Sequence, residues 1–286
     1  FQNRDELKYS LRSVEKFAKW IRNIYIVTDN QKPKWLNHKH PKINIVDHSE
    51  IFDEKENLPN FNSNAIEARL HYIEHLSENF LALNDDFFFG RKTSYKDFFI
   101  NRKTPKLFAK KIDLSKKSKI PTCPHEAAVL NARNLIFKEY NKMINWELQH
   151  GIKALNKTEM FELEQKFSKA FTETTNNHFR SFNDVWVFAL HAFYSVITDK
   201  NKPFYISTYR RNLFRYNLKI FRKNRDFVFI PLYINKEKII NKFEAIKKYK
   251  PLMFCVNDGL NVNEENNEIV IKKLKDIFPE KSEFEK

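Results

Sequence analysis

The sequence predicts an α/β protein in which a Rossmann-like, mostly parallel sheet carries a helical insertion. Short β-branched and aromatic runs alternate with amphipathic stretches in residues 1–100, and the same pairing returns in residues 250–286. Residues 120–200 between them have mainly helical periodicity. We therefore expect one domain over residues 1–286, with an α/β core built from both ends of the chain.

The first hundred residues show the order helix, strand, strand, helix, strand. Asn3 and Glu6 indicate a helix start, and apolar residues then recur at helical spacing up to Ile21. A similar pair, Asn64 and Glu67, begins the second helix. Strands are expected where the chain is β-branched or aromatic and apolar. The elements are expected at residues 3–21, 24–28, 43–46, 64–76 and 80–83.

The remainder of the chain is predicted to hold five helices, two short strands and one long loop. The loop is the basic, irregular stretch at residues 103–119. No internal repeat or Pro/Gly-rich linker marks a domain boundary. The helices are expected at 126–142, 158–171, 183–197, 236–249 and 264–278, and the strands at 204–206 and 252–256.

The composition excludes several classes of function. The chain has 286 residues and a formal net charge of +15. Its three glycines, Gly90, Gly151 and Gly259, are too far apart for a GxGxxG or Walker A phosphate loop. The basic charge indicates an anionic partner, although a solvated lysine-rich surface explains most of it. No nucleic-acid-binding motif accompanies the lysines, so we expect no nucleic acid partner.

The cysteines and the apolar runs indicate a reducing compartment and no membrane-spanning helix. Cys123 and Cys255 are too few for a zinc motif or a disulfide framework, so we expect free, buried thiols in a reducing cytoplasm. The longest apolar stretch, residues 185–197, is interrupted by His191 and is shorter than the ~20 residues that cross a bilayer. The sequence therefore predicts no transmembrane span.

Acidic residues follow three strand-like runs. The runs IYIVTDN, LALNDD and MFCVND end in Asp29, in Asp85 and Asp86, and in Asp258. If the three strands share one sheet edge, these carboxylates converge there and suit Mg²⁺ or Mn²⁺ bound to phosphate. The alternative is that each acid only forms an Asx-turn. That alternative is favoured for any single acid, but the Asn-Asp pair recurring at two strand ends favours a functional site.

Two histidine-containing motifs invite a functional interpretation. His71 and His75 form an HxxEH string, as in inverted zinc peptidases, but no third ligand is evident, so we expect ordinary surface histidines on a half-buried helix. His178 and Arg180 precede an apolar helix with Asp184 in its first turn. An arginine fork and a histidine suit phosphate, whereas the alternative for these residues is helix capping.

Longer stretches of the chain resemble a known family. The second conserved region of the Stealth family of sugar-phosphate transferases resembles FQNRDELKYSLRSVEKFAKWIRNIYIVTDNQKPKWL and LPNFNSNAIEARLHYIEHLSENFLALNDDFFFGR. Its third region resembles the stretch from His150 through EMFELEQKFSKAFTETTNNHFRSFNDVW, and its fourth resembles PLMFCVNDGLN. The closing NDGLN…FPEKSEFEK is similar to bacterial hexosamine-1-phosphate capsule polymerases of the meningococcal type.

The resemblance implies an activity. Family members transfer a sugar 1-phosphate from a UDP-sugar to an acceptor hydroxyl, here from a UDP-hexosamine to a growing phosphodiester-linked capsule oligosaccharide, and they release UMP. A cytoplasmic location is expected, with peripheral association at the inner membrane face or with capsule assembly proteins. The family's first conserved region, which helps to form the nucleotide site, is absent before Phe1, so we expect part of the donor pocket to be missing.

The matched motifs imply roles for single residues. His150 is expected to be the general base or a stabiliser of phosphate charge, and Arg180 a phosphate clamp. Asp85 and Asp258 are expected to act in catalysis as ligands of Mg²⁺ or Mn²⁺, together with Asp86. The substrate-binding residues are expected to be Asn62, Asn64, Glu67, Asn84, Asp184 and Asn257 from the motifs, with Asp29 and His178 from the patterns above.

Two alternatives stay open. A conventional UDP-sugar glycosyltransferase would use the same donor and the same acids but release UDP. A non-catalytic module that binds a polyanion would show salt-sensitive binding that survives EDTA.

Overall fold

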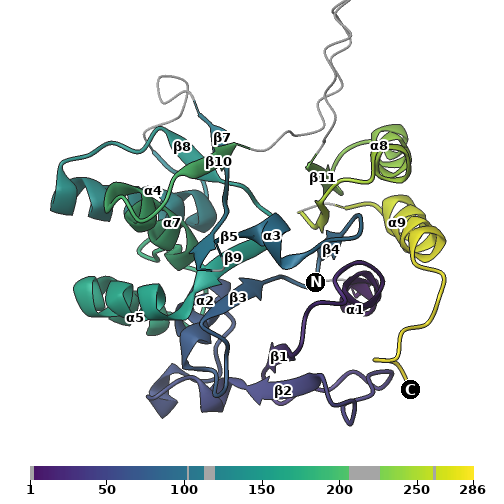
Figure 1. Ribbon diagram of the computed structural model, residues 1–286, viewed down its shortest axis with the longest axis horizontal. Coiled ribbons are helices and arrows are strands. Elements are labelled where there is room, and N and C mark those ends of the chain that lie inside the picture. The colour runs from purple at the N-terminus through teal and green to yellow at the C-terminus, as the bar shows by residue number, and fades with distance from the viewer. Residues whose placement is uncertain (1–2, 102, 113–119, 206–225, 260–261) are drawn as a thin grey trace, which may run out of the picture.

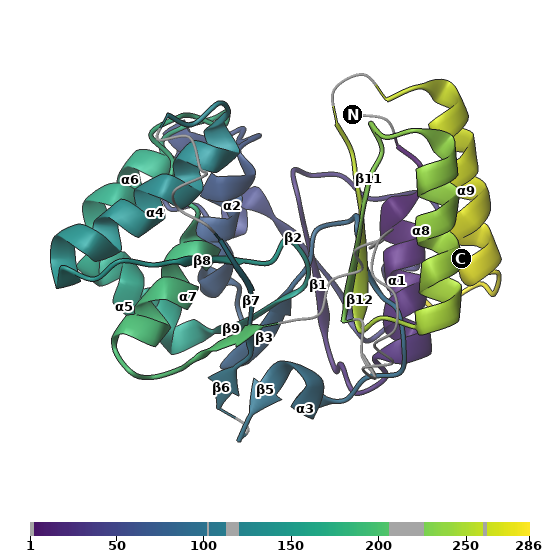
Figure 2. The ribbon, with the colours of Figure 1, turned by 90° about the horizontal axis from the view of Figure 1, so that it is seen from above.

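The fold is a layered α/β arrangement, as the sequence predicts. The computed structural model describes residues 3–101, 103–112, 120–205, 226–259 and 262–286. Figure 2 shows the strands as a middle layer between two groups of helices. One group holds α1 (Glu6–Phe17), α8 (Lys236–Tyr249) and α9 (Glu264–Ile277). The other holds α2 (Ser63–Arg69), α4 (Pro124–Tyr140), α5 (Lys157–Lys166), α6 (Ser168–Thr175) and α7 (Val187–Ile197).

The described strands form separate two- and three-stranded sheets that pair in both directions, rather than one mostly parallel sheet. The parallel pairs are β1 (Ile24–Thr28) with β2 (Ile43–Asp47), β7 (Leu107–Lys111) with β10 (Pro203–Tyr205), and β11 (Phe227–Pro231) with β12 (Met253–Asn257). The antiparallel pairs are β4 (Phe87–Phe89) with β12, β3 (Asn79–Ala82) with β9 (Lys153–Asn156), β7 with β8 (Trp146–Leu148), and β5 (Phe99–Ile100) with β6 (Thr104–Pro105).

Strand β4 is enclosed on both edges. One edge pairs with β12, and the other faces α1, where the Ser10 hydroxyl donates to the Phe87 carbonyl at 2.7 Å and Phe89 N donates to the Ser13 hydroxyl at 3.0 Å. These bonds satisfy backbone groups that would otherwise be buried without partners. The Phe88 ring stacks on Phe254 with centroids 4.8 Å apart and joins the core under α8 and α9.

A second core lies on the opposite side of the strands. It packs α4 and α7 against β7, β8 and β9 (Figure 1). Trp146 and Phe193 meet edge to face there, with ring centroids 5.0 Å apart. Burial of these large rings supplies the main stabilising term for a chain whose surface is strongly charged.

Several elements differ from their predicted ranges. The first helix ends at Phe17, short of Ile21. The helix expected over 64–76 ends at Arg69 and continues only as a 3₁₀ turn, Leu70–Tyr72. The helix expected over 158–171 divides at Phe167 into α5 and α6. Strands β6 and β7 lie in the stretch predicted as a loop, of which residues 113–119 are outside the described part of the chain, as is Ile206 of the strand predicted over 204–206.

Some side-chain expectations are also wrong. Cys255 is buried but Cys123 is exposed, and both are free. His71 is fully buried and lies 2.7 Å from the Glu164 carboxylate, whereas His75 is exposed in a left-handed backbone conformation. The chain has therefore left the helix before His75, and the HxxEH string does not present two histidines on one helical face. Among the described residues, no helix combines the length and hydropathy needed to cross a bilayer.

Candidate active site

The candidate site forms where the start of β4 meets the carboxyl end of β12. In the antiparallel register Phe87 is opposite Cys255, and Val256 N donates to the Asp86 carbonyl at 3.0 Å. The sequence predicted that Asp29, Asp85, Asp86 and Asp258 would converge if three parallel strands shared one sheet edge. The structure instead brings Asp86 to the end of β12 at the beginning of an antiparallel strand.

Three potential ligands gather at this point. One ligand atom each of Asp86, His150 and Cys255 lies within 4.8 Å of the other two. The Cys255 thiol donates to Asp86 Oδ2 at 3.3 Å, while Asp86 Oδ1 is buried and has no hydrogen-bond partner in the described residues. Burial and the charge of Asp85 raise the pKa of Asp86 to about 6, against hydrogen bonds from Cys255 and Asn257. An unpaired, buried carboxylate oxygen is a suitable ligand for a divalent cation.

His150 is held in the bend between β8 and β9 by aromatic contacts. Its ring meets Phe87 and Phe229 edge to face, at 5.2 and 6.0 Å between centroids. Gly151 permits this close approach, because a Cβ there would lie 2.9 Å from the Phe227 ring. Burial, with the charges of Lys153 and other cationic groups, lowers the pKa of His150 to about 3, so the ring is neutral at pH 7.

Lys153 is a buried cation that the sequence analysis missed. It is only 5 % exposed, and its ammonium lies 5.1 Å from the Phe87 ring centre and 5.3 Å from that of Trp186. It donates to the Gly151 carbonyl. Burial lowers the pKa of Lys153, and the Glu67 charge opposes that shift. The only signal in the sequence is one lysine inside an apolar run that becomes β9.

Glu67 is the negative counterpart of Lys153. Burial raises the pKa of its carboxyl, while Lys153 and a 2.8 Å hydrogen bond from Trp186 Nε1 hold the pKa down. The sequence predicted Glu67 as a substrate-binding residue. The structure places it in the central cluster, defined as Glu67, Asp86, His150 and Lys153.

Arg180 lies at the exposed border of the central cluster. Its Nε and Nη2 atoms donate to the Ser63 hydroxyl at 3.1 and 2.7 Å. Its positive charge lowers the pKa of both His150 and Glu67, so Arg180 acts electrostatically on two members of the central cluster. A solvent-accessible arginine whose charge acts on a buried neutral histidine suits an anionic ligand.

Asp184 fastens the loop that carries Arg180. It is fully buried and accepts hydrogen bonds from the amides of Asn62, Asn64 and Asn177 at 2.8–3.1 Å and from Ser181 N at 2.9 Å. Direct substrate binding by Asn62, Asn64 and Asp184 stays a prediction. The hydrogen bonds hold the segments that carry these three residues together.

The remaining predicted residues lie around this centre or apart from it. Asp85 is exposed next to Asp86, and Asp258 is ion-paired with Arg4 at 3.2 Å. Asp29 follows β1, where its charge acts on His48. The other members are half-buried: Asn84 before Asp85, Asn257 at the end of β12, and His178, whose Nδ1 lies 2.7 Å from the Pro59 carbonyl.

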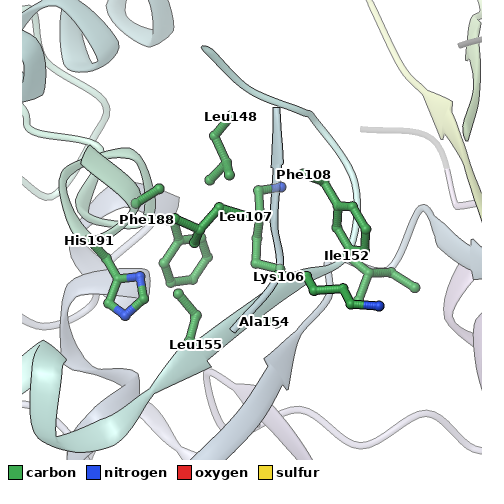
Figure 3. A pocket seen from close by; sticks show the side chains of 11 residues that line it. Lys106, Leu107, Phe108, Leu148, Ile152, Ala154, Leu155, Phe188 and His191 are labelled. Carbon is green, nitrogen blue, oxygen red and sulfur yellow. The ribbon is translucent and has the colours of Figure 1, made fainter. Parts of the chain in front are cut away.

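Two cavities lie outside the Asp86–His150 pair. The first, of about 10 Å³, is lined mainly by apolar side chains such as Leu107, Leu155 and Phe188, together with Lys106, Lys153 and His191 (Figure 3). It has room for about one water molecule and none for a sugar. The second, of about 480 Å³, lies between α1 and the C-terminal residues and is lined by Arg12 and Phe284 among others.

Asp86→Asn is expected to stabilise the folded protein at pH 7. Because the pKa of Asp86 is raised from 3.8 to about 6, ionisation is disfavoured in the folded state, and the associated stability is lost as pH rises through 6. Asparagine does not ionise. The free energy of unfolding at pH 7 should rise by about 1–3 kcal/mol, and this gain should disappear below about pH 4.

Urea denaturation at both pH values measures this difference. The matched control is Asp199→Asn, which removes an exposed carboxylate beyond α7 and should change the stability little. An Asp86→Asn variant with the same stability as the parent at pH 7 would contradict the raised pKa.

Comparison with known proteins identifies the family. Stealth conserved region 2 matches residues 1–107, and Stealth conserved region 3 matches residues 149–196. These two segments contain every residue of the central cluster as well as Arg180. The resemblance to the second and third Stealth regions is therefore confirmed, while the closeness to meningococcal-type polymerases stays a prediction.

Curated relatives agree with this result. An exopolysaccharide phosphotransferase of Streptomyces coelicolor is 40 % identical over 203 residues, which is 70 % of this chain and 35 % of the relative. Another from the same organism is 33 % identical over 297 residues, covering 100 % of this chain and 45 % of its own length. The exopolysaccharide phosphotransferase CpsY of Mycobacterium leprae is 39 % identical over 212 residues, or 71 % of this chain and 39 % of the relative. The chain spans less than half the length of these relatives, and it belongs to the Stealth family.

Proposed function

We propose that this chain is a polysaccharide phosphotransferase, which moves a hexosamine 1-phosphate from a UDP-sugar to a hydroxyl of a growing polysaccharide. The names of the relatives support the class of reaction. The observation that carries the proposal is a set of three chemically complementary groups from separate segments: ligand atoms of Asp86 and His150 lie within 4.8 Å of each other, and the charge of Arg180 acts on His150. These are the unpaired Asp86 carboxylate oxygen, the neutral His150 ring and the accessible Arg180 guanidinium.

The proposed step is an in-line displacement at phosphorus. The acceptor oxygen forms a bond to the β-phosphorus, the bond from that phosphorus to the bridging oxygen breaks, and UMP leaves with the bridging oxygen. The hydroxyl proton passes to the ring of His150, which is neutral at pH 7 and so has one unprotonated nitrogen. The negative charge of a bound diphosphate would raise the pKa of this histidine toward a useful value.

Besides a proton acceptor, the proposed transfer needs positive charge around the phosphoryl group. Phosphoryl transfer needs charge neutralisation and positioning more than covalent help from the protein. The planar fork of Arg180 can hold two phosphoryl oxygens, and the buried Lys153 adds a fixed positive charge beside His150.

A divalent cation, Mg²⁺ or Mn²⁺, fits Asp85 and Asp86. Asp86 offers the unpaired Oδ1 atom, and Asp85 is an exposed carboxylate at the adjacent position. When bound, the cation would neutralise diphosphate charge. Asp258 is a further candidate ligand, although its carboxylate is engaged by Arg4. A cytoplasmic location and association with the inner membrane or capsule assembly proteins stay predictions.

Removal of divalent cations should abolish nucleotide release. EDTA is expected to stop turnover and excess Mg²⁺ to restore it, and Asp85→Asn or Asp86→Asn should each lower kcat at least about 100-fold. Asp199→Asn serves as the control and should keep full activity. Undiminished turnover in metal-free protein would contradict the cation site.

His150→Ala and Arg180→Lys test the groups around the phosphorus. Each should lower kcat about 100- to 1,000-fold with a smaller change in the donor KM, because both residues act on the transition state. The controls are His75→Ala, at an exposed histidine, and Arg22→Lys, at an exposed arginine that also donates to a serine, Ser77. A normal turnover rate in either test variant would remove that residue from the mechanism.

The released nucleotide separates the two enzyme hypotheses. Attack at the β-phosphorus leaves UMP and a phosphodiester in the product, whereas glycosyl transfer at the anomeric carbon leaves UDP. Anion-exchange chromatography after incubation of the full-length protein with a panel of UDP-hexosamines should show UMP, and phosphorus NMR should show a phosphodiester resonance. UDP alone would support the glycosyltransferase, and EDTA-resistant polymer binding without turnover would support the polyanion-binding module.

A further inference from the structure

Two phenylalanines form an exposed stack next to the candidate site. Phe61 is 59 % exposed and Phe179 is 69 % exposed, and their rings lie 5.4 Å apart between centroids at an interplanar angle of 19°. We call this pair the aromatic platform. Burying a phenyl ring stabilises a protein by roughly 1.5–3 kcal/mol, so a stacked pair left in solvent indicates a surface that binds a partner.

The platform is held rigidly by the loops that carry it. Phe61 N donates to the His178 carbonyl at 2.8 Å, and His178 Nδ1 lies 2.7 Å from the Pro59 carbonyl. Below them, the buried Asp184 carboxylate accepts hydrogen bonds from both loops, through Asn62 on one side and Asn177 on the other. A surface fixed before binding loses little conformational entropy when a ligand arrives.

The platform borders the path to the central cluster. Phe179 immediately precedes Arg180, whose guanidinium bonds to Ser63, two residues beyond Phe61. The positive charge of Arg180 lowers the pKa of both His150 and Glu67. A ligand on the platform therefore lies beside the arginine that faces the reaction centre.

We propose that the aromatic platform binds a sugar ring of the acceptor chain. The apolar C–H face of a pyranose would pack on the phenyl rings, so that the end of the acceptor chain lies beside the phosphoryl group that Arg180 is proposed to hold. This inference rests on the proposed function and names the residues that recognise its acceptor. An open, one-sided platform suits a polymer that must shift by one unit after each addition.

The surroundings favour a sugar over the uracil ring of the donor. A base is usually read by hydrogen bonds at its edge, but the amide groups near the platform donate within the protein. Asn62 and Asn177 donate to Asp184, and Asn60 donates to the carbonyls of Asn57, Thr175 and Asn177. The platform thus offers an apolar stacking surface with no free amide, among these described residues, beside it to read a base edge, which matches the C–H face of a sugar ring.

The test measures acceptor and nucleotide binding separately in the full-length protein. The acceptor probe is the oligosaccharide that the protein itself makes from the UDP-hexosamine giving UMP, labelled with a fluorophore and followed by anisotropy. Phe61→Ala and Phe179→Ala should each raise its Kd about tenfold, Phe179→Trp should retain binding, and the Kd of UDP should stay constant. The control is Phe137→Ala, which removes a 43 % exposed phenyl ring on α4 and should change neither Kd.

Each other outcome overturns the inference. A weaker Kd for UDP with unchanged oligosaccharide binding would assign the platform to uracil. Unchanged values for both probes would leave no ligand on it, and a dimer that dissociates in the platform variants, seen by sedimentation, would make it an interface between copies. Release of UMP with any of these results keeps the proposed function, whereas absence of UMP from every donor overturns both.

Discussion

The pairing of β4 with β12 is the constraint on which the candidate site depends. Because the strands run antiparallel, the start of β4 meets the end of β12, and Asp86 reaches Cys255 and Asn257. A register shift of one residue would turn the β4 side chains to the opposite face. Gly151 ties His150 to the same layer, since only a residue without Cβ fits against Phe227.

The central cluster is unfavourable for stability and is held by its surroundings. Burial disfavours the charged forms of Lys153, Glu67, Asp86 and His150. The attraction between Lys153 and Glu67 offsets only part of the desolvation cost of that pair. Aromatic packing on both sides of the strands offsets this cost. The imbalance is typical of functional sites, where residues are retained for chemistry rather than for stability.

Local patterns in the sequence predicted the elements with strong periodicity, and long-range packing decided the rest. The strand at 24–28 and the helix at 236–249 have the predicted bounds, because the first is an unbroken β-branched and aromatic run and the second repeats apolar residues at helical spacing. Strand β4 is a run of three phenylalanines and has no such pattern. In β9, a single lysine among apolar residues gives no sign that its side chain is buried. The motifs led to Asp86, His150 and Arg180, but the role of Lys153 depends on the charge of Glu67 on α2, far away in the sequence, which no local pattern encodes.

The placement of charge favours transfer at phosphorus over transfer at carbon. Lys153 and Arg180 both lower the pKa of His150, so positive potential is concentrated where the proposed base would meet the acceptor. A glycosyl transfer develops positive charge on the sugar ring, which such a potential would oppose. A phosphoryl transfer spreads negative charge over the oxygens of the migrating group, which the same potential stabilises. The cations around His150 therefore suit a migrating phosphoryl group, and the open aromatic platform beyond Arg180 suits the sugar chain that receives it.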